Sequence, residues 1–136
     1  MKWVLTGLLL VAGQCHALTV FLYAHADRPV VDCLAHVAAV YGPVWTDFEI
    51  RPGTAWRRAV SLAIRRADVI FLIWSPAAAQ SQEVASEWKQ ALAAGKRLVP
   101  VTLGNDGTVL PGELAALQWL DAGFCRKPHS NLSSSL

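Results

Sequence analysis

The sequence predicts an α/β fold in which helices cover both faces of one parallel sheet. Apolar residues make up 54% of the 136 residues and charged residues only 16%, a balance that suits a sheet buried on both sides. Short apolar runs of strand length alternate with segments of helix length, and this alternation indicates right-handed βαβ crossovers. A chain of this length forms one main hydrophobic core, so we expect a single domain.

The first expected strand, residues 18–23 (LTVFLY), leads into a helix that runs to about residue 40. Asp27 can cap this helix, and Pro29 suits its first turn. The buried face of the helix is expected to be formed by apolar residues at helical spacing, which are Val30, Leu34 and Val37.

A second, short strand is expected over residues 44–46 and a loop over residues 48–53. A helix then runs from Thr54, its expected cap, to residue 66. This helix carries paired arginines, which are Arg57, Arg58, Arg65 and Arg66. We interpret them as a solvated helix face in preference to a phosphate-binding site.

Residues 67–74 (ADVIFLIW) form the strongest strand pattern of the sequence and are expected at the centre of the sheet. Ser75 and Pro76 end this strand. A helix beginning at Ser81 or Gln82 follows, and Gly95 stops it after residue 94.

The remaining elements are short. The strand expected at residues 98–103 contains Pro100, which cannot donate to a ladder, so this strand lies near an edge or has its proline at one end. Leu110 and Pro111 lead into a short helix, and Trp119–Leu120 is the candidate fifth strand.

The chain divides into an apolar N-terminal segment (1–17), the main domain (18–126) and a serine-rich, flexible tail (127–136). The N-terminal segment is similar to a secretory signal, but an extra hydrophobic segment or a start placed upstream of the true one are alternatives. Its apolar run is shorter than the roughly 20 residues that span a bilayer. We expect a cytoplasmic protein, with secretion as the alternative if residues 1–17 are a signal peptide.

The three cysteines, Cys15, Cys33 and Cys125, match neither a zinc-site spacing nor a disulfide framework. We expect them to be reduced packing residues. The net charge is +2 and no long basic run occurs, so nucleic acid is not an expected partner.

Several motifs occur in an order that resembles Toll/interleukin receptor (TIR) domains of the bacterial type, between about residues 18 and 121. The matching segments are Thr19–Asp27 (TVFLYAHAD), Val44–Asp47 with Ile50, Pro52–Gly53 and Trp56, Ala67–Ser75, the pattern S-x-x-V-x-x-E-W from Ser81 to Trp88, Gly95–Lys96 with Pro100–Val101, Leu110–Pro111 and Gln118–Asp121. The ordered set is more specific than any one of its parts.

The resemblance implies a flavodoxin-like three-layer sandwich whose five-stranded parallel sheet has the order 2-1-3-4-5. Such sheets bind ligands in a crevice at the carboxyl ends of the strands, where the strand order reverses. Catalytic TIR domains are NAD+ glycohydrolases or cyclases, and their essential glutamate corresponds to Glu87. NAD+ would then be the substrate, with no further cofactor and no metal required.

The chemistry agrees with a single catalytic carboxylate. Cleaving the nicotinamide–ribose bond passes through an oxocarbenium-like state, and nicotinamide leaves as a neutral molecule that needs little acid catalysis. Glu87 has no basic residue three or four positions away and borders the apolar residues Val84 and Trp88, so partial burial is expected. The alternative is an ordinary exposed charge on a helix.

Further residues are candidates for substrate binding: Tyr23, His25, Asp27, Trp56, Ser75 and Ser81. Packing is an equal alternative for Trp56, and helix capping alone would explain Ser81. Leu22 and Ala24 stand where the family usually has polar residues, and both substitutions remove polar contacts to a substrate.

A second hypothesis is a non-catalytic interaction module in signalling. TIR domains of animal receptors self-associate through a long loop, which here corresponds to the segment from Phe48 to Trp56. A scaffold has no need for a glutamate at position 87, so the sequence favours the enzyme.

Overall fold

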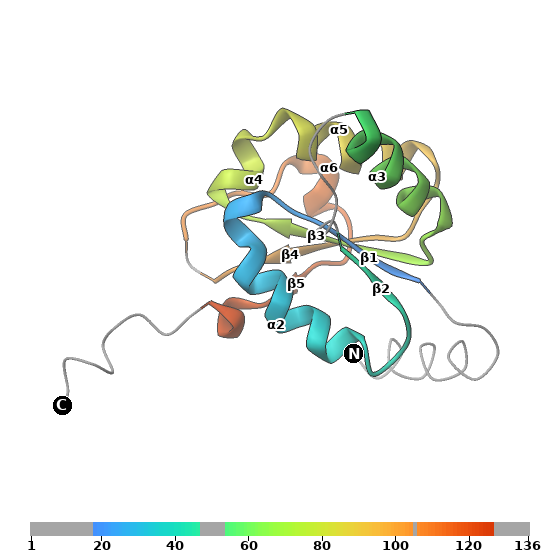
Figure 1. Cartoon of the computed structure of the whole chain (residues 1–136). Coiled ribbons are helices and arrows are strands. Elements are labelled where there is room, and N and C mark those ends of the chain that lie inside the picture. Colours follow the sequence, from blue (N-terminus) through green and yellow to red (C-terminus); the bar gives the residue numbers. More distant parts are fainter. Residues whose placement is uncertain (1–17, 47–53, 105, 127–136) are drawn as a thin grey trace.

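The computed structural model describes residues 18–46, 54–104 and 106–126. The N-terminal segment 1–17, the loop 48–53 and the tail 127–136 therefore lie outside the described residues. Five parallel strands form one sheet of order β2-β1-β3-β4-β5, which confirms the predicted fold class (Figure 1). The strands are β1 (Thr19–Leu22), β2 (Val44–Trp45), β3 (Val69–Trp74), β4 (Leu98–Thr102) and β5 (Leu120–Asp121).

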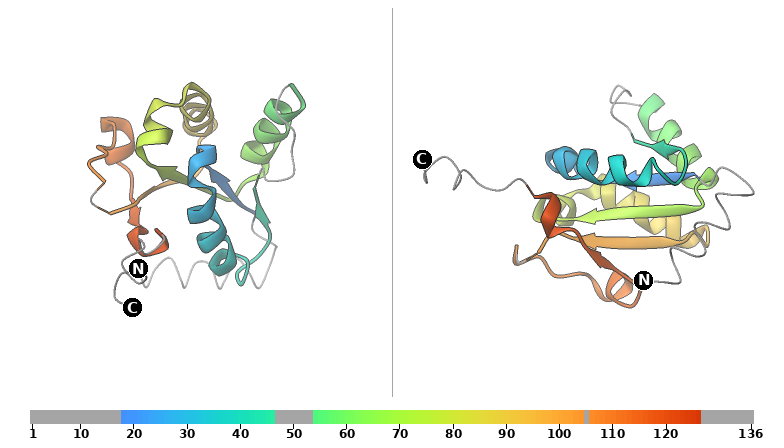
Figure 2. Two further views of the ribbon diagram at one scale, coloured as in Figure 1. Left: turned by 60° about the vertical axis from the view of Figure 1, so that its left-hand side comes forward. Right: turned by 90° about the horizontal axis from the view of Figure 1, so that it is seen from below.

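Helices cover both faces of the sheet (Figures 1 and 2). One face carries α3 (Thr54–Arg66), α4 (Pro76–Gln80), α5 (Gln82–Ala93) and α6 (Gly112–Ala115). The other face carries α2 (Arg28–Ala38) and the 3-10 turn η2 (Gly123–Cys125). A second 3-10 turn, η1 (His25–Asp27), connects β1 to α2.

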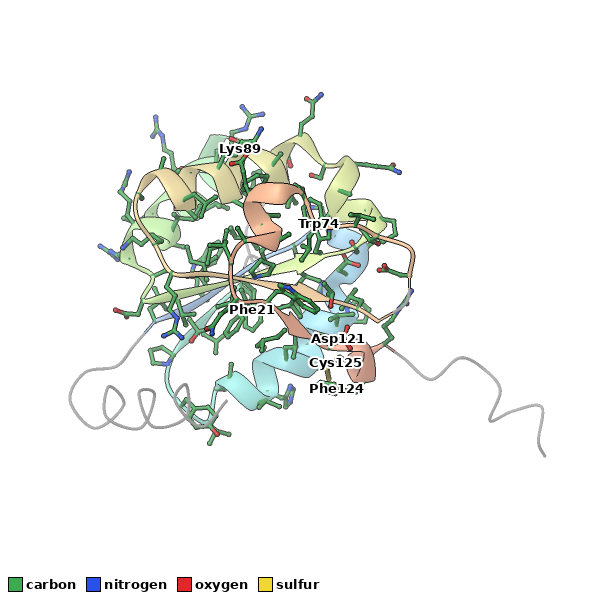
Figure 3. All side chains as sticks on the ribbon, turned by 180° about the vertical axis from the view of Figure 1, so that it is seen from behind. Phe21, Trp74, Lys89, Asp121, Phe124 and Cys125 are labelled. Carbon is green, nitrogen blue, oxygen red and sulfur yellow. A yellow bond between two sulfur atoms is a disulfide. The ribbon has the colours of Figure 1, made fainter. Side chains whose placement is uncertain are left out.

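The two faces bury separate apolar clusters because side chains alternate along each strand. In β1, Val20 and Leu22 belong to the cluster under α3 and α5, whereas Phe21 and Tyr23 belong to the cluster under α2. Phe21 stacks on Phe71 of β3, with ring centroids 5.5 Å apart (Figure 3).

The start and the buried face of α2 differ from the prediction. The side chain of Asp27 makes no capping hydrogen bond, because η1 intervenes and turns this carboxylate toward Ser75. Val30 is buried as predicted, but Val37 is 58% exposed and Val31 is fully buried in its place. The buried face of α2 therefore includes Val31 and excludes Val37.

Serine side chains begin two successive helices after β3. Ser75 caps α4, a short helix that the sequence pattern did not predict, by accepting a hydrogen bond from Ala78 N at 3.0 Å. Ser81 caps α5 by accepting from Val84 N at 3.2 Å. Gly95, with φ of +69°, ends this helix as predicted.

Pro100 lies in the middle of β4, one strand away from the sheet edge. The carbonyl of Thr102 accepts from Ala122 N at 2.7 Å, so alternate residues of β4, Pro100 included, face β5. Because β5 pairs only with the last two residues of β4, the missing N–H of the proline removes no bond from the ladder.

Cys33 and Cys125 form a disulfide, which contradicts the expectation of reduced cysteines. The bond joins α2 to η2 across 92 residues of sequence, with the two Cα atoms 5.8 Å apart. No short cysteine spacing could indicate this pairing, because only the fold brings the segment after β5 against α2. The third cysteine, Cys15, lies outside the described residues.

Candidate functional site

The candidate site lies at the carboxyl edge of the sheet, where β1 and β3 diverge toward different neighbours. Asp27 follows β1 and Ser75 follows β3, so the chain brings these two predicted site residues together across 48 positions of sequence. Both side chains are buried, with 9% of Asp27 and 3% of Ser75 exposed.

The two side chains form one hydrogen-bonded unit. The Ser75 hydroxyl donates to Asp27 Oδ2 and at the same time accepts from Ala78 N in the first turn of α4. Burial raises the pKa of the Asp27 carboxyl above its ordinary value of 3.8, although the hydrogen bond from Ser75 opposes this rise. Such a carboxyl holds its proton to a higher pH than an exposed aspartate does.

Two further charges act on this carboxyl from the ends of β4 and β5. The negative charge of Asp106 adds to the raised pKa of Asp27, and the positive charge of Arg126 lowers it. Arg126 is held in place because its Nη1 donates to the carbonyl of Leu103 at 3.1 Å. The sequence analysis missed both residues, although each follows a predicted strand and the carboxyl ends of parallel strands share one edge.

Glu87 lies on α5 and is only 9% exposed. By helical spacing it falls between Trp88, which faces the core, and Gln90, which faces α3. Ser61 Oγ of α3 donates to Gln90 Oε1 at 3.3 Å, and this bond fixes the relative position of the two helices. The glutamate therefore lies at the seam between α3 and α5, partly buried as predicted.

Trp56 lies near the N-terminal end of the helix that neighbours α5. It lies in the first turn of α3 and packs, partly buried, against the apolar cluster that also contains Trp88. Trp56 and Glu87 both precede the bonded pair Ser61 and Gln90 in their own helices, and the two helices run in the same direction. Trp56 and Glu87 therefore both lie on the N-terminal side of the Ser61–Gln90 hydrogen bond.

The other predicted site residues are spread over different surroundings. Tyr23 is buried in the cluster under α2, on the face of the sheet opposite to Glu87. His25 is exposed in η1, and Ser81 caps the helix that carries the glutamate. The structure therefore brings Asp27 and Ser75 together, and it places Trp56 and Glu87 toward the N-terminal ends of the neighbouring helices α3 and α5, but the candidates do not all surround one point.

The described residues hold neither a candidate metal cluster nor a helix suited to a membrane. Within that part of the chain, no group of three or more His, Cys, Asp or Glu side chains is placed to hold a metal ion. No helix there is both long and apolar enough to cross a membrane.

The comparisons with known proteins agree with this geometry. A family model described as "TIR domain" matches residues 20–132. The structure is similar to the crystal structure of the TIR domain of the Toll-related receptor TRR-2 from the lower metazoan Hydra magnipapillata, with a TM-score of 0.64 and 17% identity over 80% of this chain and 85% of that chain. No curated protein sequence matches this chain. The family match, together with the strand order, shows that this chain belongs to the TIR-domain family.

Proposed function

We propose that this domain cleaves the nicotinamide–ribose bond of NAD+, with Glu87 as the catalytic carboxylate. The observation that carries the proposal is the burial of this glutamate on α5, next to Trp88 of the cluster against which the partly buried Trp56 packs. Burial keeps competing water away from a carboxylate, so its charge acts more strongly on a positive charge that develops beside it, as in a cationic transition state.

In the proposed reaction, the bond between the nicotinamide nitrogen and ribose C1′ breaks, and the bonding electrons leave with neutral nicotinamide. The developing oxocarbenium ion on the ribose faces the Glu87 carboxylate, which stabilises it through charge. Water then adds at C1′ and loses a proton, which gives ADP-ribose. Attack by a group of the same molecule in place of water would give a cyclic product. Neither route requires a metal or a second cofactor.

The remaining candidates have supporting roles in this proposal. Trp56 offers an aromatic face on which a nicotinamide or adenine ring can stack. Asp27 and Ser75 shape the end of the crevice between β1 and β3, and Ser81 fixes the start of the helix that carries the glutamate. His25 is exposed near the end of β1 and can contact a ligand from the rim.

The test is NAD+ consumption with product identification by purified protein at high concentration. Glu87→Gln removes the charge with little change of shape, and we expect a loss of about a hundredfold or more in turnover. The matched control is Glu83→Gln, one turn earlier on the exposed side of the same helix, which should keep full activity. Thermal unfolding of both variants separates loss of catalysis from loss of fold.

One observation favours a second candidate, an interaction module that binds other TIR domains. TIR domains commonly self-associate or bind other TIR-domain proteins. Here large apolar side chains are exposed near the β5 edge, where Trp119 is 51% exposed. Phe124, which Figure 3 labels, is 77% exposed. If the wild-type protein consumes no NAD+, even when it is fused to an oligomerising partner, the enzyme proposal fails and this second function is favoured.

A further inference from the structure

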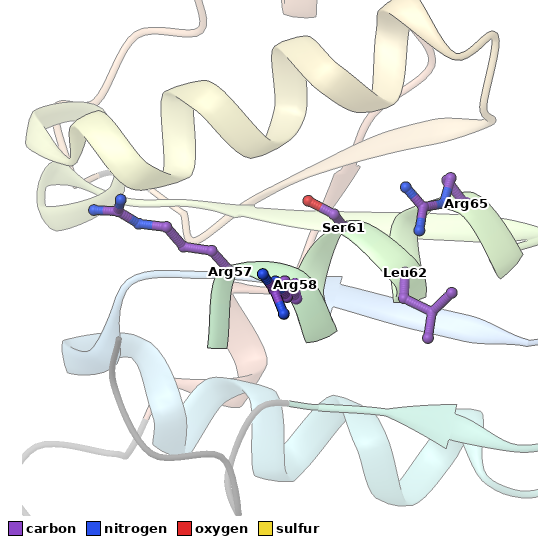
Figure 4. A pocket seen from close by; sticks show the side chains of 5 residues that line it. All are labelled: Arg57, Arg58, Ser61, Leu62 and Arg65. Carbon is purple, nitrogen blue, oxygen red and sulfur yellow. The ribbon is translucent and has the colours of Figure 1, made fainter. Parts of the chain in front are cut away.

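The outer surface of α3 forms a shallow hollow that the candidate site does not use. The hollow has a volume of about 390 Å³ and is lined by Arg57, Arg58, Ser61, Leu62 and Arg65 (Figure 4). Figure 4 shows that the Arg65 side chain points back toward Ser61, whereas Arg57 extends away from it. The buried face of the same helix is formed by other residues, among them Val60 and Ile64.

The spacing of these residues places three positive charges on one side of the helix. Positions 57, 58, 61 and 65 fall within a third of the helix circumference, and Arg57 and Arg65 are about 12 Å apart along the axis. All three arginines are exposed and line the hollow. Three positive charges on one side of a helix raise the local positive potential, which attracts an anion.

We propose that this hollow binds a phosphate-bearing anion with at least two negative charges. A guanidinium group forms paired hydrogen bonds with phosphate oxygens, and the Ser61 hydroxyl supplies a further donor between the arginines. A single carboxylate would neutralise only one of the three charges, whereas a diphosphate offers enough charge and length to engage several guanidinium groups. The phosphate can belong to a soluble phosphate ester or to a lipid headgroup.

Binding in the hollow would also reach α5. The Ser61 hydroxyl donates to Gln90 Oε1 at 3.3 Å and so links a side chain of α3 to a side chain of α5. A phosphate oxygen that accepts from Ser61 competes with Gln90 for the same proton. We therefore expect the backbone amide signals around Gln90, as well as those around Ser61, to shift when the anion binds.

The test uses inorganic pyrophosphate as the soluble probe, followed by calorimetry and by amide chemical shifts at low salt. The wild-type protein should bind it saturably, and added salt should weaken binding because these charges are exposed. Arg58→Gln combined with Arg65→Gln should weaken binding by about tenfold or more. Because pyrophosphate contains no nicotinamide–ribose bond, this result does not depend on the proposed NAD+ cleavage.

The matched control is Arg66→Gln combined with Arg97→Gln, which removes the same charge from exposed residues outside the hollow. Neither side chain lines the hollow, so this variant should leave pyrophosphate binding within about twofold when both double variants are compared at about 0.15 M salt, where charges more than about 8 Å apart are screened. A second arm uses phosphatidylcholine vesicles with and without a phosphoinositide. Vesicle binding that needs both the phosphoinositide and Arg58 with Arg65, in the absence of pyrophosphate binding, identifies a headgroup as the source. The proposal is overturned if neither probe binds, or if both double variants weaken binding equally.

Discussion

The two faces of the sheet are built by different means. The face under α3 and α5 carries two long helices whose apolar sides cover one continuous cluster, and they are joined by packing and by the bond from Ser61 to Gln90. The face under α2 carries one long helix and the short turn η2, and these are joined by the bond between Cys33 and Cys125. The one-turn helix α6 keeps its place on the first face by burying Leu114 completely, whereas the turn η2 on the second face is in addition tied covalently to α2.

The largest expected effect of this difference is on stability when the disulfide is removed. In the chain-entropy description, a bond that closes a loop of 92 residues contributes about 4.6 kcal/mol, so Cys33→Ala combined with Cys125→Ala should lower the free energy of unfolding by roughly that amount. Urea denaturation measures the change. The loss should be accompanied by faster amide exchange in η2 and α2 than in α3 and α5.

Reduction of the wild-type protein provides the control for that prediction. A reductant should lower the stability of the wild type toward that of the double variant and leave the double variant unchanged. If the oxidised and reduced wild-type proteins unfold at the same urea concentration, then packing alone holds η2 and the contrast between the two faces is wrong.

Elements that depend on nearby residues could be predicted from the sequence, and contacts between distant segments could not. Strands β1, β3 and β4 and helices α3 and α5 were predicted to within about two residues, because long apolar runs and helical spacing depend only on nearby residues. The disulfide, the exposure of Val37 and the η1 turn depend on how distant segments meet. Local patterns carry no information about such contacts.

The residues of the candidate site also differ in how well local sequence patterns could predict them. The pattern from Ser81 to Trp88 was enough to predict a partly buried Glu87, because one helix determines which of its residues face inward. The roles of Asp27 and Ser75 were harder to predict. By local rules Asp27 was a suitable helix cap and Ser75 the end of a strand, and only the sheet topology turns Asp27 from capping α2 to accepting from Ser75.

A smaller effect is expected from removing each of the two serine caps. Ser75 caps α4 and also donates to Asp27 of another segment, whereas Ser81 only caps α5. Ser75→Ala removes the cap of α4 and also the hydrogen-bond donor to the buried Asp27, and should cost about 2–3 kcal/mol. Ser81→Ala removes only the cap of α5 and should cost about 1 kcal/mol. Urea denaturation of the two variants measures both values.

The double variant Ser75→Ala with Asp27→Asn sharpens this comparison. If part of the cost of Ser75→Ala comes from leaving a buried carboxylate without its donor, then the cost should be smaller when position 27 carries a neutral amide. Equal costs in the two backgrounds would mean that the bond between Ser75 and Asp27 contributes nothing beyond the cap of α4.

The smallest effect is on pH dependence, where a buried and an exposed aspartate of the same sheet edge should act in opposite directions. Burial raises the pKa of Asp27 above 3.8, so the folded protein holds this proton more tightly than the unfolded chain does. That contribution to stability is complete below pH 3.8 and is lost as the pH rises through the folded pKa. Asp27→Asn should therefore gain stability relative to the wild type as the pH rises through this range.

Asp121 should show the opposite slope. Hydrogen bonds from the Thr102 hydroxyl and from Gly104 N hold the pKa of this carboxyl below 3.8, so its contribution is present above that value and is lost as the pH falls through the folded pKa. Asp121→Asn should lose stability relative to the wild type as the pH rises. Thermal unfolding of the three proteins between about pH 2.5 and 6 measures both slopes. Slopes of the same sign would show that burial does not dominate at Asp27, because the bond from Ser75 would then stabilise the charged carboxylate by more than its removal from water costs.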